Sequence, residues 1–247
     1  MEYNVTSISE RPDLIEEINQ MYSSAWPGFV AGEKVMNAYW GIISENFSDH
    51  QLLLMNDDKI LAIVNSAAFH LGNEPHDISS DGLYWGLKKI SHDICNHKKP
   101  DNLMALQVVV NPQYTGKGLS YYCIKELKKF AAEMGYANIY IPLRPSKKHL
   151  YPLIPIEKYI HFIDKSNQPY DPWLRVNVKL GGEIIKPCKG IKIIDSIEQW
   201  EKWTGIKFPF EGSYIVPFAM SPVDVDLKKN QVTYNQENVW IRHRIGD

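Results

Sequence analysis

The sequence predicts an α/β fold (α+β in the broader sense) in which helices flank one mixed sheet. Three observations favour this class. Segments with helical periodicity alternate with segments rich in β-branched residues, two apolar segments form a hairpin in the first half, and a strand, a loop with two glycines and a helix follow at 103–134. Such alternation around a hairpin is typical of one mixed sheet. The 247 residues can bury a large core, and we expect residues 1–247 to form a single domain.

The first half of the chain is expected to supply four strands and three helices. Leu14, Ile18 and Met21 repeat at helical spacing, and "WPGF" ends that helix at Trp26. The short polar segment "NDDK" lies between two apolar segments and predicts the turn of the hairpin. The expected elements are, in order, a strand at 2–9, helices at 11–26 and 33–47, strands at 50–55 and 59–71, a helix at 83–97 and a strand at 103–110.

The second half is less regular. Gly135 is placed to end the helix that follows the glycine loop. Asp171 as N-cap and Pro172 in the first turn predict another helix, which the glycine pair at 181–182 ends. The expected elements are a helix at 119–134, a strand at 137–143, helices at 171–182 and 197–205, and strand-like segments at 212–220 and 239–245.

Composition excludes several classes of protein. A formal net charge of -2 argues against a nucleic-acid-binding chain. The three cysteines are far apart without a CxxC pair, so we expect neither a disulfide framework nor a metal site. No apolar segment approaches the roughly 20 residues of a membrane span, and the N-terminus lacks the pattern of a signal peptide. These observations predict a soluble, cytoplasmic protein with no nucleic-acid or membrane partner.

The loop at 111–118 has the properties of an anion site. Pro112 ends the strand because it has no N–H for the ladder, and Gly116 and Gly118 leave room for a close ligand. The first N–H groups of the following helix face this loop, where the helix dipole also attracts negative charge, and Lys117 adds a cation. The sequences GxGxxG and GxxxxGK[ST] are both absent, which excludes a dinucleotide fingerprint and a Walker A loop.

The hexapeptide Gln113-Tyr114-Thr115-Gly116-Lys117-Gly118 resembles motif A of the GCN5-related N-acetyltransferase (GNAT) superfamily. The resemblance covers roughly residues 2–143. It implies a GNAT-type sheet, mixed and mostly antiparallel, with a core at 1–145, a pyrophosphate loop at 111–118 and an extension at 146–247 that completes the sheet and the acyl or acceptor site. It also implies that coenzyme A contacts the following residues: Val108, Val109, Val110, Gln113, Tyr114, Thr115, Gly116, Lys117, Gly118 and Leu119.

The segments "WPGF", "RPSKKHLYP" and "DPWLR" resemble a narrower branch, the GNAT-like malonyl-CoA decarboxylase and S-acetyltransferase domains of polyketide synthase loading modules and their stand-alone relatives. This resemblance implies an acyltransferase that uses acetyl-CoA or malonyl-CoA, with an acyl carrier protein as a possible acceptor. It implies catalytic roles for Thr115 and His149, which would hold the malonyl carboxylate, and for Trp26, which would exclude water. An arginine is also implied; Arg144 and Arg175 compete for this role, and Arg175 is preferred.

Two other functions stay open. The first is N-acetyl transfer to a small-molecule or protein amine. In that reaction a Glu on the strand before motif A often serves as the base; Gln107 without any acid on this strand weakens the interpretation, although a water chain can replace a direct base. The second is a non-catalytic module that binds acyl-CoA or a carrier protein. An exposed aromatic patch would favour it, with these candidates: Trp200, Trp203, Tyr214 and Trp240.

Overall fold

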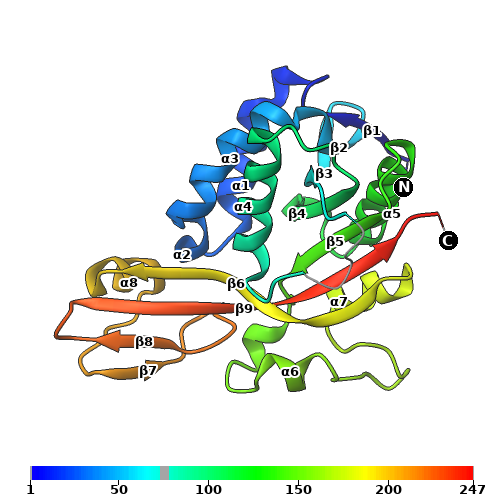
Figure 1. The fold of residues 1–247 in the computed structure, drawn as a ribbon. Helices are drawn as coiled ribbons and strands as arrows, with labels where there is room; N and C mark the ends of the chain where they lie inside the picture. The colour runs from blue at the N-terminus through cyan, green and yellow to red at the C-terminus, as the bar shows by residue number, and fades with distance from the viewer. Residues whose placement is uncertain (1, 73–77, 247) are drawn as a thin grey trace.

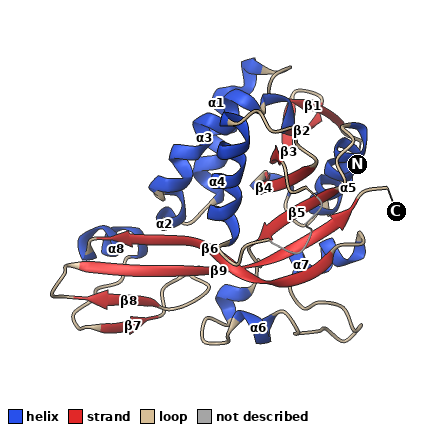
Figure 2. Ribbon diagram, in the orientation of Figure 1, coloured by secondary structure: helices blue, strands red, loops and turns tan. Residues whose placement is uncertain are grey.

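A nine-stranded sheet organises the computed structural model, which describes residues 2–72 and 78–246 (Figures 1 and 2). The strand order is β1-β2-β3-β4-β5-β9-β8-β7, and β6 pairs with the other edge of β9. Within the described residues, β4 and β5 are the one parallel pair, so the expected mixed, mostly antiparallel sheet is confirmed. The strands are β1 Asn4–Ser7, β2 Gln51–Asn56, β3 Lys59–Phe69, β4 Asn102–Val110, β5 Asn138–Leu143, β6 Glu183–Asp195, β7 Gly212–Tyr214, β8 Val223–Asp226 and β9 Gln231–Arg244.

Helices cover both faces of the sheet. The four helices α1–α4 lie on one face, and α5 packs on β3 and β4 from the other face, where it also contacts α7 (Figure 1). The helix α8 packs against α2 and β9. The α-helices are α1 Ile15–Ala25, α2 Gly28–Ala31, α3 Lys34–Asn46, α4 Gly82–Cys95, α5 Leu119–Glu133, α6 Ile156–Tyr159, α7 Pro172–Lys179 and α8 Ile197–Thr204, and the short 3-10 helices are η1 Pro12–Leu14, η2 Ser48–His50, η3 Pro112–Tyr114 and η4 Lys148–Leu150.

The central strands are largely apolar and buried because helices cover both of their faces. In β3 every residue from Ile60 to Phe69 is buried. Ala67 and Phe69 face the cluster beneath α4, whereas Val64 and Ala68 face the cluster beneath α5. The core therefore consists of two layers that meet at the sheet, and a site within the sheet lies between them.

The two parallel strands separate soon after they meet. Pairing between β4 and β5 is limited to Leu103 with Ile139 and Met104 with Tyr140, although β4 continues to Val110 on its β3 side. From Ala105 onward, β4 has no strand partner on its β5 side. This divergence opens the sheet near its centre.

The C-terminal third contains strands that the sequence analysis missed. The 13-residue strand β6 was not predicted, and β9, at 14 residues, extends well before the expected segment at 239–245. The expected strand at 212–220 is limited to the three residues of β7. Pro187 and Gly190 interrupt the pattern of β6, which still pairs with β9 through two register shifts. The long antiparallel pair of β6 and β9 extends the sheet to one side (Figure 2).

Candidate active site

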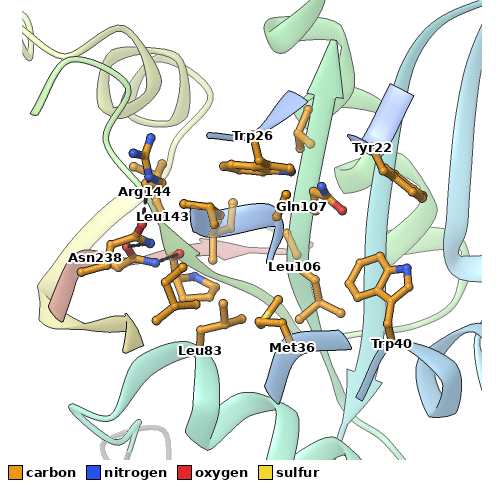
Figure 3. A pocket seen from close by; sticks show the side chains of 18 of the residues that line it. Tyr22, Trp26, Met36, Trp40, Leu83, Leu106, Gln107, Leu143, Arg144 and Asn238 are labelled. Carbon is orange, nitrogen blue, oxygen red and sulfur yellow. Dashed lines mark hydrogen bonds between the residues drawn. The ribbon is translucent and has the colours of Figure 1, made fainter. Parts of the chain in front are cut away.

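A cavity of about 500 Å³ occupies the gap between β4 and β5 (Figure 3). Its walls come from both helical layers, because α1–α4 contribute from one face of the sheet and α5 and α7 from the other. The cavity therefore lies between the two helical layers, where the sheet is open. The lining residues used below are Tyr22, Trp26, Met36, Trp40, Leu83, Gln107, Val108, Ile124, Arg144, Asn177, Gln236 and Asn238.

Aromatic side chains form much of the wall on the α1–α3 side. The rings of Tyr22 and Trp40 meet edge to face with their centroids 6.1 Å apart, and Trp26 follows the last residue of α1. The amide nitrogen of Asn65 donates a hydrogen bond of 2.7 Å to the Tyr22 hydroxyl. Burial raises the pKa of Tyr22 to about 12, so this phenol is neutral at physiological pH. This part of the wall is thus largely aromatic, and Asn65 holds the Tyr22 hydroxyl in place.

Arg144 is the cationic side chain of the cavity and lies across it from Tyr22 and Trp40 (Figure 3). Its Nε donates to Gln236 Oε1 at 3.0 Å, and its Nη2 donates to the carbonyl of Phe218 at 2.8 Å. Gln236 in turn donates to Asn238 Oδ1 at 3.0 Å, which orients the amide that Arg144 contacts. Burial lowers the pKa of Arg144, yet a guanidinium remains charged in a protein. The cavity therefore holds a fixed positive charge.

The loop before α5 is open to solvent. Gly116 and Gly118 have φ values of 77° and 75°, in the left-handed region that favours glycine, and Gly118 directly precedes the first residue of α5. No side chain caps this end of α5, so its first N–H groups are left for a ligand. The Lys117 ammonium lies 4.9 Å from the centre of the Tyr114 ring. This geometry suits an anion such as a pyrophosphate.

No family model matches the sequence. The chain is 28% identical over 276 residues to the arginine N-acetyltransferase avaD of Aspergillus versicolor, with 98% of the chain and 94% of that protein covered. Among solved structures, the loading GNATL domain of CurA from Lyngbya majuscula has a TM-score of 0.61 at 16% identity, and the match covers 99% of this chain and 98% of that one. The GphF GNAT-like decarboxylase in complex with isobutyryl-CoA has a TM-score of 0.57 at 12% identity, with 99% of both chains covered. The fold is that of the GCN5-related N-acetyltransferases.

Within this GNAT fold, the residues implied by the sequence resemblance lie in different places. Trp26 and Val108 line the cavity. Thr115 is exposed at the loop, and its hydroxyl donates to the Pro112 carbonyl at 3.0 Å. His149 is half-buried with its ring 5.8 Å from that of Phe218, outside the cavity lining.

The two competing arginines are also separated. Arg175 is ion-paired with Asp164 at 2.9 Å and does not line the cavity, whereas Arg144 does. The remaining predicted coenzyme A residues, Val109, Val110, Gln113, Tyr114 and Leu119, lie along the end of β4, the loop and the start of α5.

The polar residues that support Arg144 were not predicted from the sequence. Gln236 and Asn238 are two apart on β9, so their side chains point to the same face of the strand. The polar residues "QEN" directly before the apolar segment "VWI" were the available signal.

Some groups that often take part in catalysis are missing from the described part of the chain. Among the described residues, none of those that line the cavity is an Asp, Glu or His. No group of three His, Cys, Asp or Glu side chains among residues 2–72 and 78–246 is arranged to hold a metal ion. Every helix in these ranges is too short or too polar to cross a bilayer. The proposed aromatic patch does not form either, because Trp200 and Trp240 are fully buried.

Proposed function

We propose that this chain is an acyl-CoA-dependent N-acyltransferase that moves a short acyl group, acetyl in the first instance, to a primary amine of a small molecule. The observation that carries the proposal is the gap between β4 and β5, where pairing ends at Met104 and Tyr140 and the cavity reaches both helical layers. A thioester entering from the α5 side and an amine entering from the α1–α3 side would meet between the strands. This arrangement brings the two reactants into one geometry, which supplies much of the rate enhancement in transfer reactions.

The parts of the site suit the parts of an acyl-CoA. The N–H groups at the start of α5, with Lys117 beside them, fit the pyrophosphate. The edge of β4 beyond Met104 has backbone groups that no strand of the sheet pairs with on the β5 side. Such groups can bind the amides of the pantetheine arm and stabilise the oxyanion that forms at the thioester carbonyl. Ile124 and Asn177 line the cavity on the side from which this arm would enter.

The transfer step requires an unprotonated amine. An ammonium first gives one proton to water, because the described lining has no Asp, Glu or His to accept it. The nitrogen lone pair then forms the C–N bond, the C–S bond breaks, and sulfur leaves with the electron pair. The nitrogen loses a second proton and the thiolate takes up one. Tyr22, whose pKa of about 12 keeps it protonated, can donate a proton but not accept one.

An amine acceptor is favoured by the relative avaD, which is by name an arginine N-acetyltransferase and matches along nearly the whole chain. Decarboxylation of malonyl-CoA is the second candidate, and the cation of Arg144 in the cavity favours it. Thr115 and His149, the residues implied for that reaction, do not line the cavity, so no imidazole is placed there to protonate an enolate. We therefore rank acyl transfer to an amine first, decarboxylation of malonyl-CoA second and acyl transfer to a carrier-protein thiol third.

The test uses purified full-length protein with acetyl-CoA and a panel of amines, and follows both free coenzyme A and acetylated product by mass spectrometry. A parallel reaction contains malonyl-CoA alone, with His149→Ala as the comparison variant. Acetylated amines with wild type support the proposal. Acetyl-CoA formed from malonyl-CoA by wild type but not by His149→Ala, without acetylated amine, would replace it with the decarboxylase function. Binding of both thioesters without any turnover would indicate a non-catalytic acyl-CoA module.

A further inference from the structure

The strongest unassigned feature of the molecule is the uncompensated charge of Arg144. It lines the cavity, burial lowers its pKa, and its two hydrogen bonds go to an amide oxygen and a backbone carbonyl rather than to a carboxylate. Among the described residues Arg144 forms no ion pair, whereas Arg11, Arg175 and Arg242 each have a carboxylate partner within 2.9 Å. A half-buried guanidinium without a counter-charge is costly unless a ligand supplies one.

The acid whose charge acts on Arg144, Asp171, is already engaged in other hydrogen bonds. Asp171 accepts hydrogen bonds from the backbone N–H groups of Lys147 at 2.7 Å and Trp173 at 2.9 Å, and from the Tyr159 hydroxyl at 3.0 Å. These contacts fix Asp171 as the N-cap of α7. Its carboxylate therefore stabilises a helix end; its charge favours the Arg144 cation from a distance, and neither carboxylate oxygen forms an ion pair with the guanidinium.

The support beneath Arg144 fixes its orientation. Asn238 donates to the Pro142 carbonyl at 2.8 Å and accepts from Gln236, whose amide oxygen then has to face Arg144 Nε. Arg144, Gln236 and Asn238, which form this series of hydrogen bonds, are all buried or half-buried. Such a network holds a guanidinium in place before the ligand arrives, as recognition of a planar carboxylate requires.

We propose that the acceptor amine carries a carboxylate and that Arg144 binds it, so that the substrate class is the free α-amino acids. This inference rests on the proposed N-acyltransferase function. The apolar wall formed by Trp26, Met36 and Leu83 takes the side chain of the amino acid, and the described lining offers no acid to pair with a cationic side chain. The carboxylate, rather than a charge on the side chain, is the group that the site selects.

The experiment compares amino acids with the amines that lack only the carboxylate. With acetyl-CoA, the values of kcat/KM are measured for phenylalanine against phenethylamine and for arginine against agmatine. We expect wild type to prefer each amino acid by about a hundredfold, the range expected for a partly desolvated ion pair. In Arg144→Gln this preference should fall to within a few-fold. The value of kcat/KM should decrease for the amino acids and stay unchanged for the amines without a carboxylate.

Two further variants separate charge from folding. Gln236→Glu places a carboxylate beside Arg144 Nε without removing the arginine, and it should abolish the preference in the same way. Arg11→Gln removes an arginine that is paired with Asp13 at the surface, and it should keep the wild-type preference. Amines acetylated without preference for the carboxylate would overturn the inference and leave the N-acyltransferase function intact. No acetylated amine of either kind would overturn the function itself.

The other source of a carboxylate is the acyl group of malonyl-CoA. The same variants are therefore compared for binding of malonyl-CoA and acetyl-CoA by calorimetry. Similar affinities in wild type and Arg144→Gln support the acceptor as the partner of Arg144. Selective loss of malonyl-CoA binding, with an unchanged preference between amino acid and amine, would assign Arg144 to the acyl group and overturn the inference.

Discussion

Replacing Gly118 by alanine separates backbone strain from ligand binding. Gly118 has φ 75° and ψ 14°, and Gly205, at the end of α8, has φ 70° and ψ 8°. A Cβ atom would meet nothing within 4 Å at either position. Left-handed backbone costs an alanine about 1–2 kcal/mol, and the lower entropy of the unfolded variant offsets about 0.4–1 kcal/mol. Both variants should therefore lose about 1 kcal/mol of unfolding free energy.

The two variants should differ in their use of coenzyme A. The empty space around Gly118 lies at the N–H groups where the pyrophosphate is proposed to bind, so the added methyl group should raise the KM for acetyl-CoA at least about tenfold, or ~1.4 kcal/mol. Gly205→Ala should leave this KM unchanged. Urea denaturation and steady-state kinetics measure the two quantities on the same preparations. Equal KM values for both variants would refute the placement of the pyrophosphate at this loop.

Two other predictions concern stability. Burial lowers the pKa of His243 to about 4, so between pH 7.5 and 5 the unfolded chain takes up a proton at this side chain and the folded chain does not. Between these two pH values the free energy of unfolding should therefore fall by about 2 kcal/mol because of His243. Urea titrations of wild type and His243→Gln at pH 7.5 and pH 5 measure this loss, which should be smaller by about 2 kcal/mol in the variant. An identical loss in both proteins would contradict the assignment. Gly82→Ala should cost at least about 3 kcal/mol, because its φ is +59° and the new Cβ would lie 1.9 Å from the Lys189 carbonyl oxygen, whereas Gly41→Ala in α3, with open space around it, should gain about 0.5–1 kcal/mol. Thermal unfolding that ranks these two variants in the opposite order would refute the packing argument.

The first two thirds of the chain were largely predictable. The hairpin of β2 and β3, the helices α1, α3, α4 and α5, and the start of α7 at Asp171 lie close to where the sequence placed them. Asp171 accepts from the N–H groups of Trp173 and Leu174, as its predicted role as N-cap requires. The strand β6 was missed because its pairing with β9 joins segments far apart in the chain, and pattern alone does not reveal such pairing. The four-residue strand β8, which pairs with β9 across a short turn between Asp226 and Gln231, was missed as well.

By itself, the sequence determined the backbone geometry of the glycine loop before α5. Pro112, Gly116 and Gly118 act on their own backbone angles and on the helix that follows directly, so their effect depends only on near neighbours. Only the tertiary structure placed Arg144, rather than the preferred Arg175, in the cavity. Gln236, 92 residues further along the chain, orients Arg144, and the register of β5 and β6 on β9 decides that they meet. A one-residue change in register would turn Gln236 to the other face, so the charge of the site is set by the pairing of the whole sheet.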